Sequence, residues 1–468
     1  MVIRKIHKWA GIFGAAWMFV LALTGFFLNH KNMDWLWRVQ VPSMLFNKEV
    51  KKEWPRYFEA IQSDPLNTKK IILAGRTGIY LSEDSGKTFR ITDKSQTYLL
   101  RSFQKPDLAT AFFAGSSNGI LISDNGGEKW RLFALEGKRI DSINIFQNFI
   151  YAVSEKRYLW KIDIATGNTE SLIAGKIPVQ EIPDSIALSR LVRDLHYARG
   201  YFSGIGSLFI NDTSSIWLVW LTLSGMTVFI LIYLSKRNKI SRNMKKTVKG
   251  WMKMHSLSGG VFIFIPVLVL LITGILIDHP DFLKSISGKG VVHQKFLPPV
   301  YRDLSTDIWN FDFDGKYYRI GNRMGVYASP DLQQWKLDSA GFSWKMRRDN
   351  HRLHVFGMGS SNRVLENNRW TKQEGHVHMI RDFTNIGGKP FYLHQHSQGQ
   401  IVFPDPENGF PVYFLMVYLH NGLIFHKSWV WINDLVSVLL LMVMITGIIR
   451  WVKKREKRKK NKRSRVLS

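Results

Sequence analysis

The stretch that decides the fold is Lys5–His30, KIHKWAGIFGAAWMFVLALTGFFLNH, and it occurs a second time as Lys253–His279, KMHSLSGGVFIFIPVLVLLITGILIDH. Each copy begins with a Lys-x-His motif, continues as an apolar run that ends in Thr-Gly, and closes on Asn-His or Asp-His. An apolar run of about 20 residues matches the roughly 30 Å hydrocarbon core of a bilayer. The sequence therefore predicts a membrane helix that has been duplicated.

Two further apolar runs complete this pattern. The predicted spans are Trp9–Leu28, Ile216–Leu234, Leu257–Ile277 and Val430–Val452. A Leu-His pair precedes both the second and the fourth span, at His196 and His420. The predicted fold class is thus membrane α-helical: a four-helix transmembrane bundle built from a duplicated two-helix unit, with a pseudo-two-fold axis along the membrane normal and two β-rich, propeller-like insertions.

The same pattern divides the chain into eight segments. They are an N-terminus with the first span (1–30), a first insertion (31–214), the second span (215–235), a basic loop (236–254), the third span (255–279), a second insertion (280–425), the fourth span (426–452) and a basic tail (453–468).

Positive charge gathers in three of these segments. The N-terminus, Ser235–Met254 and the tail from Arg450 together hold 22 of the 65 Lys and Arg. By the positive-inside rule they are cytoplasmic, which places both termini inside a bacterial inner membrane and both insertions in the periplasm. A basic tail directly after a span is typical of binding to anionic lipid, so we expect no nucleic-acid partner.

The absence of cysteine excludes a disulfide scaffold, thiolate metal sites and cysteine nucleophiles.

Two histidines stand out on the predicted cytoplasmic side. Of the 14 histidines, only His7 and His255 lie there, at equivalent places in the two copies. A pseudo-two-fold axis brings equivalent residues face to face, so one iron would receive an imidazole from each, as in a bis-His haem b.

The outer side offers more candidates, namely His30, His196, His279, His420 and His426. At about 100° per residue, His30 and His279 point away from the helix faces that carry His7 and His255. This geometry favours His196 and His420 as outer ligands and leaves His30, His279 and His426 as alternatives.

Each span also carries one pair of small residues. The pairs are Thr24-Gly25, Ser224-Gly225, Thr273-Gly274 and Thr446-Gly447. Small residues let membrane helices approach closely, and they also leave room for a flat prosthetic group.

These residues carry a resemblance to a known family. The Lys-x-His-x-x-x-Gly start, the Leu/Ile-Thr-Gly end and the Leu-His before a Trp-flanked span resemble the PepSY-associated transmembrane family, which includes inner-membrane di-haem proteins that act as ferric-siderophore reductases. The resemblance covers the four spans and their margins. It implies two b-type haems, one near each membrane face, with His7, His255, His196 and His420 as ligands. It also implies ferric iron in a siderophore as the periplasmic acceptor.

The predicted function is therefore a haem-b transmembrane electron-transfer protein, an oxidoreductase of the ferric-siderophore reductase type that serves iron acquisition. No flavin or nicotinamide fingerprint is present, because Gly259-Gly260 lies inside a span and not after a strand. The electron donor is then a separate cytoplasmic molecule or a quinol. The alternative is a non-enzymatic, membrane-anchored module whose β-rich insertions bind a periplasmic protein or glycan.

Three segments of the insertions share one turn signature. This signature resembles the Asp-box, Ser-x-Asp-x-Gly-x-Thr-Trp, of propeller and sialidase-like proteins. It occurs at Gly75–Phe89 and Gly115–Trp130 and, in shortened form, at Gly321–Trp335. Such residues shape a hairpin turn, so we assign them a structural role and no catalytic one. Two copies are too few for a closed propeller in the first insertion, which suggests that both insertions complete one β assembly.

The second insertion is rich in histidine. Six of the 14 histidines fall within it, at His351, His354, His376, His378, His394 and His396. Alternate residues of a strand share a face, so each His-x-His pair projects two imidazoles to one side. The two pairs form a candidate site for zinc, copper, iron or a further haem, with His376, His378, His394 and His396 as its ligands. Local hydrogen bonding within a β face is the alternative, and we favour it.

Overall fold

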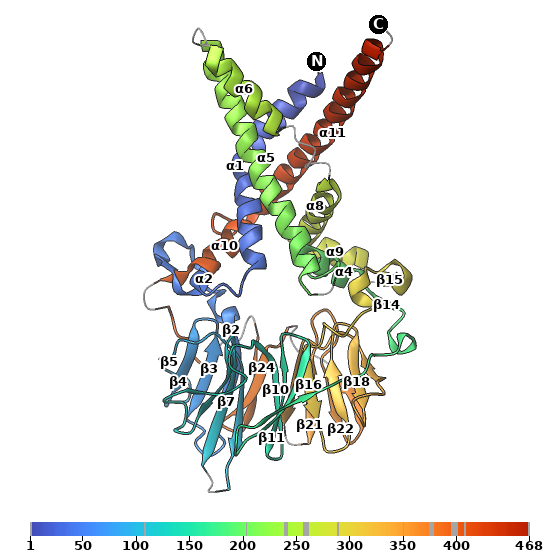
Figure 1. The fold of residues 1–468 in the computed structure, drawn as a ribbon. Coiled ribbons are helices and arrows are strands. Elements are labelled where there is room, and N and C mark those ends of the chain that lie inside the picture. Colours follow the sequence, from blue (N-terminus) through green and yellow to red (C-terminus); the bar gives the residue numbers. More distant parts are fainter. Residues whose placement is uncertain are drawn as a thin grey trace. The chain divides into compact units, whose positions relative to one another are not determined.

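The computed structural model describes residues 2–106, 109–202, 204–237, 242–255, 262–287, 290–349, 351–373, 379–394, 401–406 and 409–466. The chain forms two compact units, each assembled from segments that are distant in sequence (Figure 1). A helical unit contains Met1–Lys31, Leu191–Gly288 and Pro411–Ser468, and a β-rich unit contains Asn32–Arg190 and Lys289–Phe410. The two insertions therefore fold together, as the shortage of Asp-boxes in the first one suggests.

The helical unit is built from three long helices and several short ones. The long helices are α1 (Val2–Asn29), α5 (Gly206–Arg237) and α11 (Val430–Val466). The short ones are α4 (Leu188–His196), α6 (Arg242–His255), α8 (Phe264–Asp278), α9 (Pro280–Ser287), α10 (Val412–His420) and the 3₁₀ turn η6 (Lys427–Trp429).

Three helical stretches are long and apolar enough to cross a membrane: Val2–Asn29, Gly206–Ser235 and Lys427–Glu456. A fourth crossing exists if α8 and α9, which meet at a bend of 102°, form one span. Residues 256–261, which contain the predicted start of the third span, lie outside the described residues. Within the described ranges, length and composition thus support three of the four predicted crossings directly.

Two of the helices inside the segments predicted as insertions, α4 and α10, lead to the Leu-His pairs. Helix α4 precedes α5 within 31–214, and α10 lies within 280–425. In α4, Leu188, Leu191, Val192 and Leu195 recur at helical spacing, which is typical of an amphipathic helix. These helices end at His196 and His420, so the Leu-His pairs are helix ends within the helical unit.

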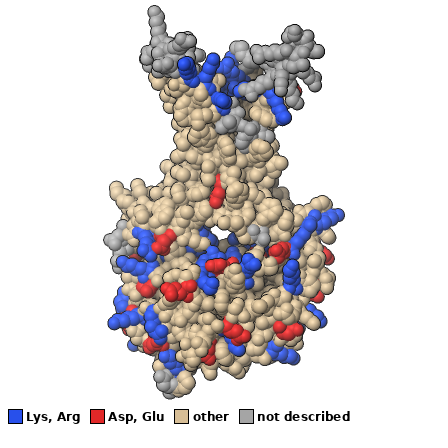
Figure 2. Space-filling model, viewed as in Figure 1, with Lys and Arg blue, Asp and Glu red and all other residues tan. Residues whose placement is uncertain are grey.

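Apolar side chains hold the helical unit together. Met18, Val267, Val436 and Leu440 are buried in one cluster, and partly buried Trp and Leu side chains pack against it. The beginning of α1, helix α6 and the end of α11 lie at the same end of this unit (Figure 1). Lys and Arg gather at that end, whereas the visible side of the helices is almost free of them (Figure 2). This distribution agrees with the expectation that the three basic segments share one side of a membrane.

The main part of the β-rich unit is a set of six antiparallel sheets in the described residues, three from each insertion. Two further two-stranded sheets pair β14 (Ser185–Ala187) with β15 (Val291–His293) and β1 (Gln40–Val41) with β26 (Phe410–Pro411). The first insertion forms β2 (Phe58–Ser63), β3 (Ile71–Gly75), β4 (Gly78–Ser82) and β5 (Arg90–Asp93); β6 (Thr97–Gln104), β7 (Thr110–Ser116), β8 (Gly119–Ser123) and β9 (Arg131–Ala134); and β10 (Ile140–Phe146), β11 (Phe149–Ser154), β12 (Tyr158–Asp163) and β13 (Thr169–Leu172). The second forms β16 (Asn310–Phe313), β17 (Tyr318–Gly321), β18 (Gly325–Ser329) and β19 (Lys336–Ala340); β20 (Lys345–Asp349), β21 (Arg352–Phe356), β22 (Arg363–Glu366) and β23 (Arg369–Lys372); and a two-stranded sheet of β24 (Asp382–Ile386) and β25 (Lys389–Leu393).

The six sheets are propeller-like blades whose first strands follow one another around a ring: β2 contacts β6, β6 contacts β10, β10 contacts β16, β16 contacts β20, and β24 contacts β2. Between β20 and β24, Arg347 pairs with Asp382. Consecutive strands of each blade pair in register, for example Ile72 opposite Leu81 in the first blade. The last blade closes on the first, because the Ile61 amide donates to Asp382 Oδ2 at 3.2 Å and the Ser63 amide to Thr384 Oγ1 at 3.0 Å. Apolar side chains between the blades form the core, where Ile79, Leu100 and Phe112 are fully buried. Neither insertion would form this ring alone.

Short elements link the blades and the two units. They are α2 (Trp35–Arg38), β1 (Gln40–Val41), η1 (Ser43–Leu45), α3 (Lys48–Lys51), η2 (Trp54–Tyr57), η3 (Val179–Glu181), β14 (Ser185–Ala187), β15 (Val291–His293), η4 (Gln294–Phe296), η5 (Pro299–Tyr301) and β26 (Phe410–Pro411). Strands β14 and β15 pair with each other, which ties the end of the first insertion to the start of the second.

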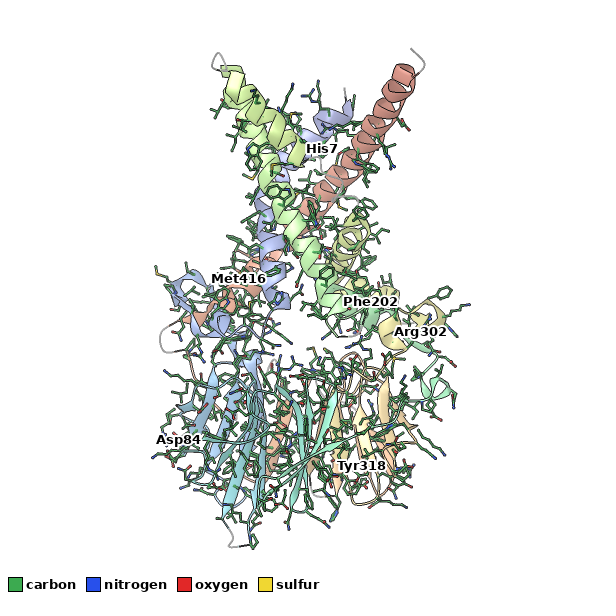
Figure 3. All side chains as sticks on the ribbon, viewed as in Figure 1. His7, Asp84, Phe202, Arg302, Tyr318 and Met416 are labelled. Carbon is green, nitrogen blue, oxygen red and sulfur yellow. The ribbon has the colours of Figure 1, made fainter. Side chains whose placement is uncertain are left out.

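The Asp-box residues form turns between the third and fourth strands of three blades. Asp84, labelled in Figure 3, accepts a hydrogen bond from the Thr88 amide at 2.9 Å. Asn125 accepts one from the Lys129 amide at 3.0 Å, and Asp331 accepts one from the amide two residues on at 2.9 Å. These side chains serve the backbone, which is the structural role that the signature predicts.

Candidate functional site

The predicted inner histidines face each other. The ring centroids of His7 on α1 and His255 at the end of α6 are 6.3 Å apart, and Figure 3 labels His7. His7 Nδ1 lies 3.1 Å from the Val443 carbonyl and 3.0 Å from Thr446 Oγ1, both on α11. His255 Nδ1 lies 2.9 Å from Ser224 Oγ on α5. Each imidazole is therefore held by the small-residue pair of another helix.

The predicted outer histidines form a second pair of the same kind. His196 at the end of α4 and His420 at the end of α10 have ring centroids 6.3 Å apart. His196 Nδ1 lies 3.2 Å from Thr273 Oγ1 on α8, and His420 Nδ1 lies 2.9 Å from Thr24 Oγ1 on α1. The two pairs repeat one arrangement, as a duplicated chain requires.

The hydroxyl groups select the tautomer of each imidazole. Thr24 Oγ1 donates to the carbonyl of Val20 at 2.6 Å, and Thr446 and Thr273 donate to the carbonyls four residues before them at 2.6 and 2.7 Å. Ser224 Oγ donates to a carbonyl three residues before it at 3.2 Å. Because each hydroxyl hydrogen is used in this way, the oxygen accepts from Nδ1–H of the histidine. Nε2 then keeps a free lone pair, which is the form of histidine that binds a metal.

The glycine after each hydroxyl residue gives the imidazole its room. A Cβ at Gly225 would lie 3.1 Å from His255 Cε1, and one at Gly274 would lie 3.3 Å from His196 Cε1. At Gly25 and Gly447 the corresponding distances to the histidine rings are 3.4 and 3.5 Å. Every small-residue pair of the four spans thus forms a seat for one histidine, a role beyond helix packing that the sequence did not reveal.

The separation of each pair fits one iron between two imidazoles. A metal–imidazole bond of about 2 Å and about 1 Å from the nitrogen to the ring centre give about 6 Å between two centroids on opposite sides of one ion. Both observed separations are 6.3 Å. On α5, Asn211 contacts the His196 backbone and Ser224 contacts His255. At a rise of 1.5 Å per residue these residues are about 20 Å apart, so the two sites are well separated along the helices.

The alternative outer histidines occupy other places. His30 Nε2 lies 2.9 Å from Asp212 Oδ2, and His279 Nε2 lies 2.7 Å from Asp434 Oδ2. His426 Nδ1 accepts a hydrogen bond from the Ser428 amide at 3.1 Å and caps the turn η6. The first two are equivalent His–Asp pairs, and none of the three belongs to a facing pair of histidines.

Sequence reasoning missed the polar residues at the outer ends of α5 and α11. Asn211 donates to the His196 carbonyl at 3.3 Å, and Asn433 donates to the His420 carbonyl at 3.4 Å. Each is followed by the aspartate that contacts His30 or His279. The signal was the tripeptide Ile-Asn-Asp, which occurs at 210–212 and again at 432–434.

The histidine-rich part of the second insertion is only partly described. His376, His378 and His396 lie outside the described residues, and His394 is half-buried with contacts of its own. Within the described ranges no group of three or more His, Asp or Glu could hold a metal ion. His354 is buried with its ring 4.4 Å from that of Phe383, and burial lowers its pKa to about 4. It is a neutral core histidine.

No known family model matches the chain, and no curated protein matches it. Among solved structures it is similar to a protein of unknown function from Bacteroides thetaiotaomicron, with 6% identity over 72% of this chain and 67% of that one and a TM-score of 0.35. It is also similar to PorZ, a surface component of the type-IX secretion system of Porphyromonas gingivalis (6% identity, 72% of this chain, 35% of that one, TM-score 0.30). A third is YCF48 from Cyanidioschyzon merolae (11% identity, 68% and 85% covered, TM-score 0.27). These likenesses are too distant to carry an argument about function.

Proposed function

We propose that this chain is a transmembrane electron-transfer protein that binds two b-type haems and reduces an acceptor outside the cytoplasm. The observation that carries the proposal is the repeated seat, in which the hydroxyl of Thr-Gly or Ser-Gly holds Nδ1 of a histidine whose ring centroid lies 6.3 Å from that of a second histidine. Haem b, when bound, would supply one-electron chemistry at each pair.

The residues of this chain would hold and orient that group. His7 with His255, and His196 with His420, would supply the axial nitrogens. The four hydroxyls would keep each imidazole in the Nδ1–H tautomer and raise its basicity as a ligand. The buried cluster that contains Met18, Val267 and Leu440 would exclude water between the two sites. Low solvent access is one of the means by which a protein sets a reduction potential.

The direction of transfer and the acceptor are parts of the same proposal. Both termini and the loop 236–254 would be cytoplasmic because of their basic residues, and a cytoplasmic donor or a quinol would supply electrons there. The resemblance of the repeated motif to the PepSY-associated transmembrane family supports ferric iron in a siderophore as the acceptor. Reduction to ferrous iron would weaken its binding by hard oxygen ligands and so release it.

The test is the haem content of the purified protein and of four histidine variants. We expect a dithionite-reduced b-type spectrum and two haems per chain. His7→Ala or His255→Ala should remove about half of the haem, because one missing imidazole leaves an iron poorly held. His196→Ala or His420→Ala should remove the other half, and His426→Ala, at an exposed turn, should keep both.

Two outcomes would contradict the proposal. Full haem content in all four variants would refute these ligands and direct attention to His30 and His279. A wild-type protein without any b-type spectrum, purified from cells that are replete with haem, would favour the membrane-anchored binding module.

A further inference from the structure

Basic side chains gather where the first strands of several blades begin. Glu59, the second residue of β2, pairs with Arg381 at 2.9 Å and with Arg76 at 3.9 Å. Lys345, the first residue of β20, donates from Nζ to the carbonyl of Tyr98 at 3.2 Å. The Arg76 guanidinium lies 4.8 Å from the Tyr98 ring centroid, so these groups form one cluster across the blades.

A second layer of basic groups lies deeper between the same strands. Asp382 on β24 pairs with Arg347 at 2.7 Å and with Arg101 at 3.6 Å. Arg347 also donates to Gln62 Oε1 at 2.5 Å, which ties β20 to the first blade. Lys345 interacts electrostatically with both Glu59 and Asp382, so it stands between the two layers.

The two layers contain more positive than negative charge. In the described part of the unit, Arg381 pairs with Glu59, and Arg101 and Arg347 share Asp382, whereas Lys345 has no carboxylate within ion-pair distance. Arg101 is 6% exposed, and its Nε has no hydrogen-bond partner there. A buried donor without a partner is costly, and an excess of cations in a partly desolvated place attracts an anion strongly.

The chemistry of the cluster selects the kind of anion. Guanidinium groups bind carboxylates through two parallel hydrogen bonds, and the arginines here are fixed by their pairs and by stacking. Arg381 lies 5.6 Å from the Trp344 ring centroid and Arg76 lies 5.4 Å from that of Trp37. The Trp344 ring, which is partly exposed, supplies contact area for the carbon skeleton of an organic ligand.

We propose that this cluster, defined by Arg76, Arg101, Lys345, Arg347 and Arg381, binds a polycarboxylate anion at the start of the inner strands of the propeller. Lys345 supplies the unneutralised charge at the centre, and Arg76 and Arg381 hold the ligand from the rim. The site belongs to the β-rich unit alone, so it stands or fails independently of haem binding.

The experiment titrates citrate into the full-length protein in detergent at low ionic strength, with calorimetry and thermal unfolding as readouts. Wild-type protein should bind citrate and unfold at a higher temperature in its presence, whereas acetate at matched ionic strength should have little effect. Lys345→Met should weaken citrate binding at least tenfold, and Arg381→Gln should weaken it several-fold. Lys129→Met, at an exposed lysine of the second Asp-box, is the matched control and should bind like wild type.

A second readout separates a binding role from a structural one. Burial lowers the pKa of Lys345, so the ammonium is held at a cost and Lys345→Met should leave the ligand-free protein at least as stable as wild type. The proposal is overturned if citrate and acetate shift the unfolding of wild type equally, or if Lys345→Met retains wild-type affinity for citrate. Should Lys345→Met fail to fold, the comparison of wild type with Arg381→Gln decides the question by the same criterion.

Discussion

A single imidazole in this protein is placed by two adjacent residues of another helix. The hydroxyl group of Thr or Ser fixes which ring nitrogen carries the hydrogen, and the following glycine lets the ring lie against the helix backbone. At Gly225 the space is tightest, because a Cβ there would lie 3.1 Å from His255 Cε1. At this distance the histidine ring must move if any side chain is added.

Gly225→Val should therefore displace His255 and remove about half of the bound haem, through loss of the inner site alone. Gly250→Val is the matched control, since Gly250 is an exposed helical glycine whose added Cβ would contact nothing within 4 Å. Haem content and the reduced spectrum of the two purified variants provide the measurement. Equal haem content in both variants would show that the glycine seat does not constrain the ligand.

Sequence reasoning paired the histidines whose rings face each other, because the repeat places them at equivalent positions and symmetry brings equivalent residues together. It could not show what holds them. The hydrogen bond from His420 to Thr24 joins residues 396 positions apart, and no local pattern signals a contact of that range. Asn211 and Asn433 were missed for a different reason: two polar residues within a long apolar helix look like surface positions until the two spans are aligned.

At the scale of elements, the blades depend on contacts that the turn signature does not reveal. The Asp-box marks the turn between the third and fourth strands of three blades. The strands of the other three blades are joined by turns that share no common motif. Helices α4 and α10 lie in segments that the sequence assigned to the insertions, and each has only 9 residues, too few to cross a membrane. His354 lies at the junction of the last two blades, where its ring on β21 packs against Phe383 on β24.

This junction should make the propeller sensitive to acid. In the unfolded chain His354 binds a proton near pH 6.5, whereas burial lowers its pKa to about 4 in the folded state. Between these values the unfolded state holds more protons, so stability is complete above pH 6.5 and falls as the pH drops toward 4, by at most about 3 kcal/mol. Thermal or urea unfolding followed by tryptophan fluorescence would measure the loss.

His354→Leu should flatten this pH dependence. Because the substitution also changes the packing around the ring, the slope of stability against pH is the quantity to compare. His351→Leu, three residues earlier at an exposed position, is the control and should keep the wild-type slope. Identical slopes for wild type and His354→Leu would assign the acid sensitivity to other groups.

At the scale of the whole molecule, the shared ring constrains how the chain crosses the membrane. Both insertions contribute three blades, and the ring closes through hydrogen bonds from β2 to β24. Both insertions must then lie on the same side of the membrane. If α5 crosses the membrane once, the chain between α5 and the second insertion must cross back. Helix α8 lies in this part of the chain and has 15 residues.

Reporter fusions test this requirement. Periplasmic reporters fused after Lys48 and after Lys289 should both be active, and one fused after Lys249, in the basic loop, should be inactive; cytoplasmic reporters should give the opposite result. The expected physical reason is that the 22 basic residues would keep three segments in the cytoplasm while the shared ring would keep both insertions together on the other side. A reporter after Lys289 that reads as cytoplasmic, while the one after Lys48 reads as external, would place the two halves of the ring on opposite sides. The propeller could not then form in the membrane-inserted chain, and the return crossing through α8 would be refuted together with the four-helix bundle.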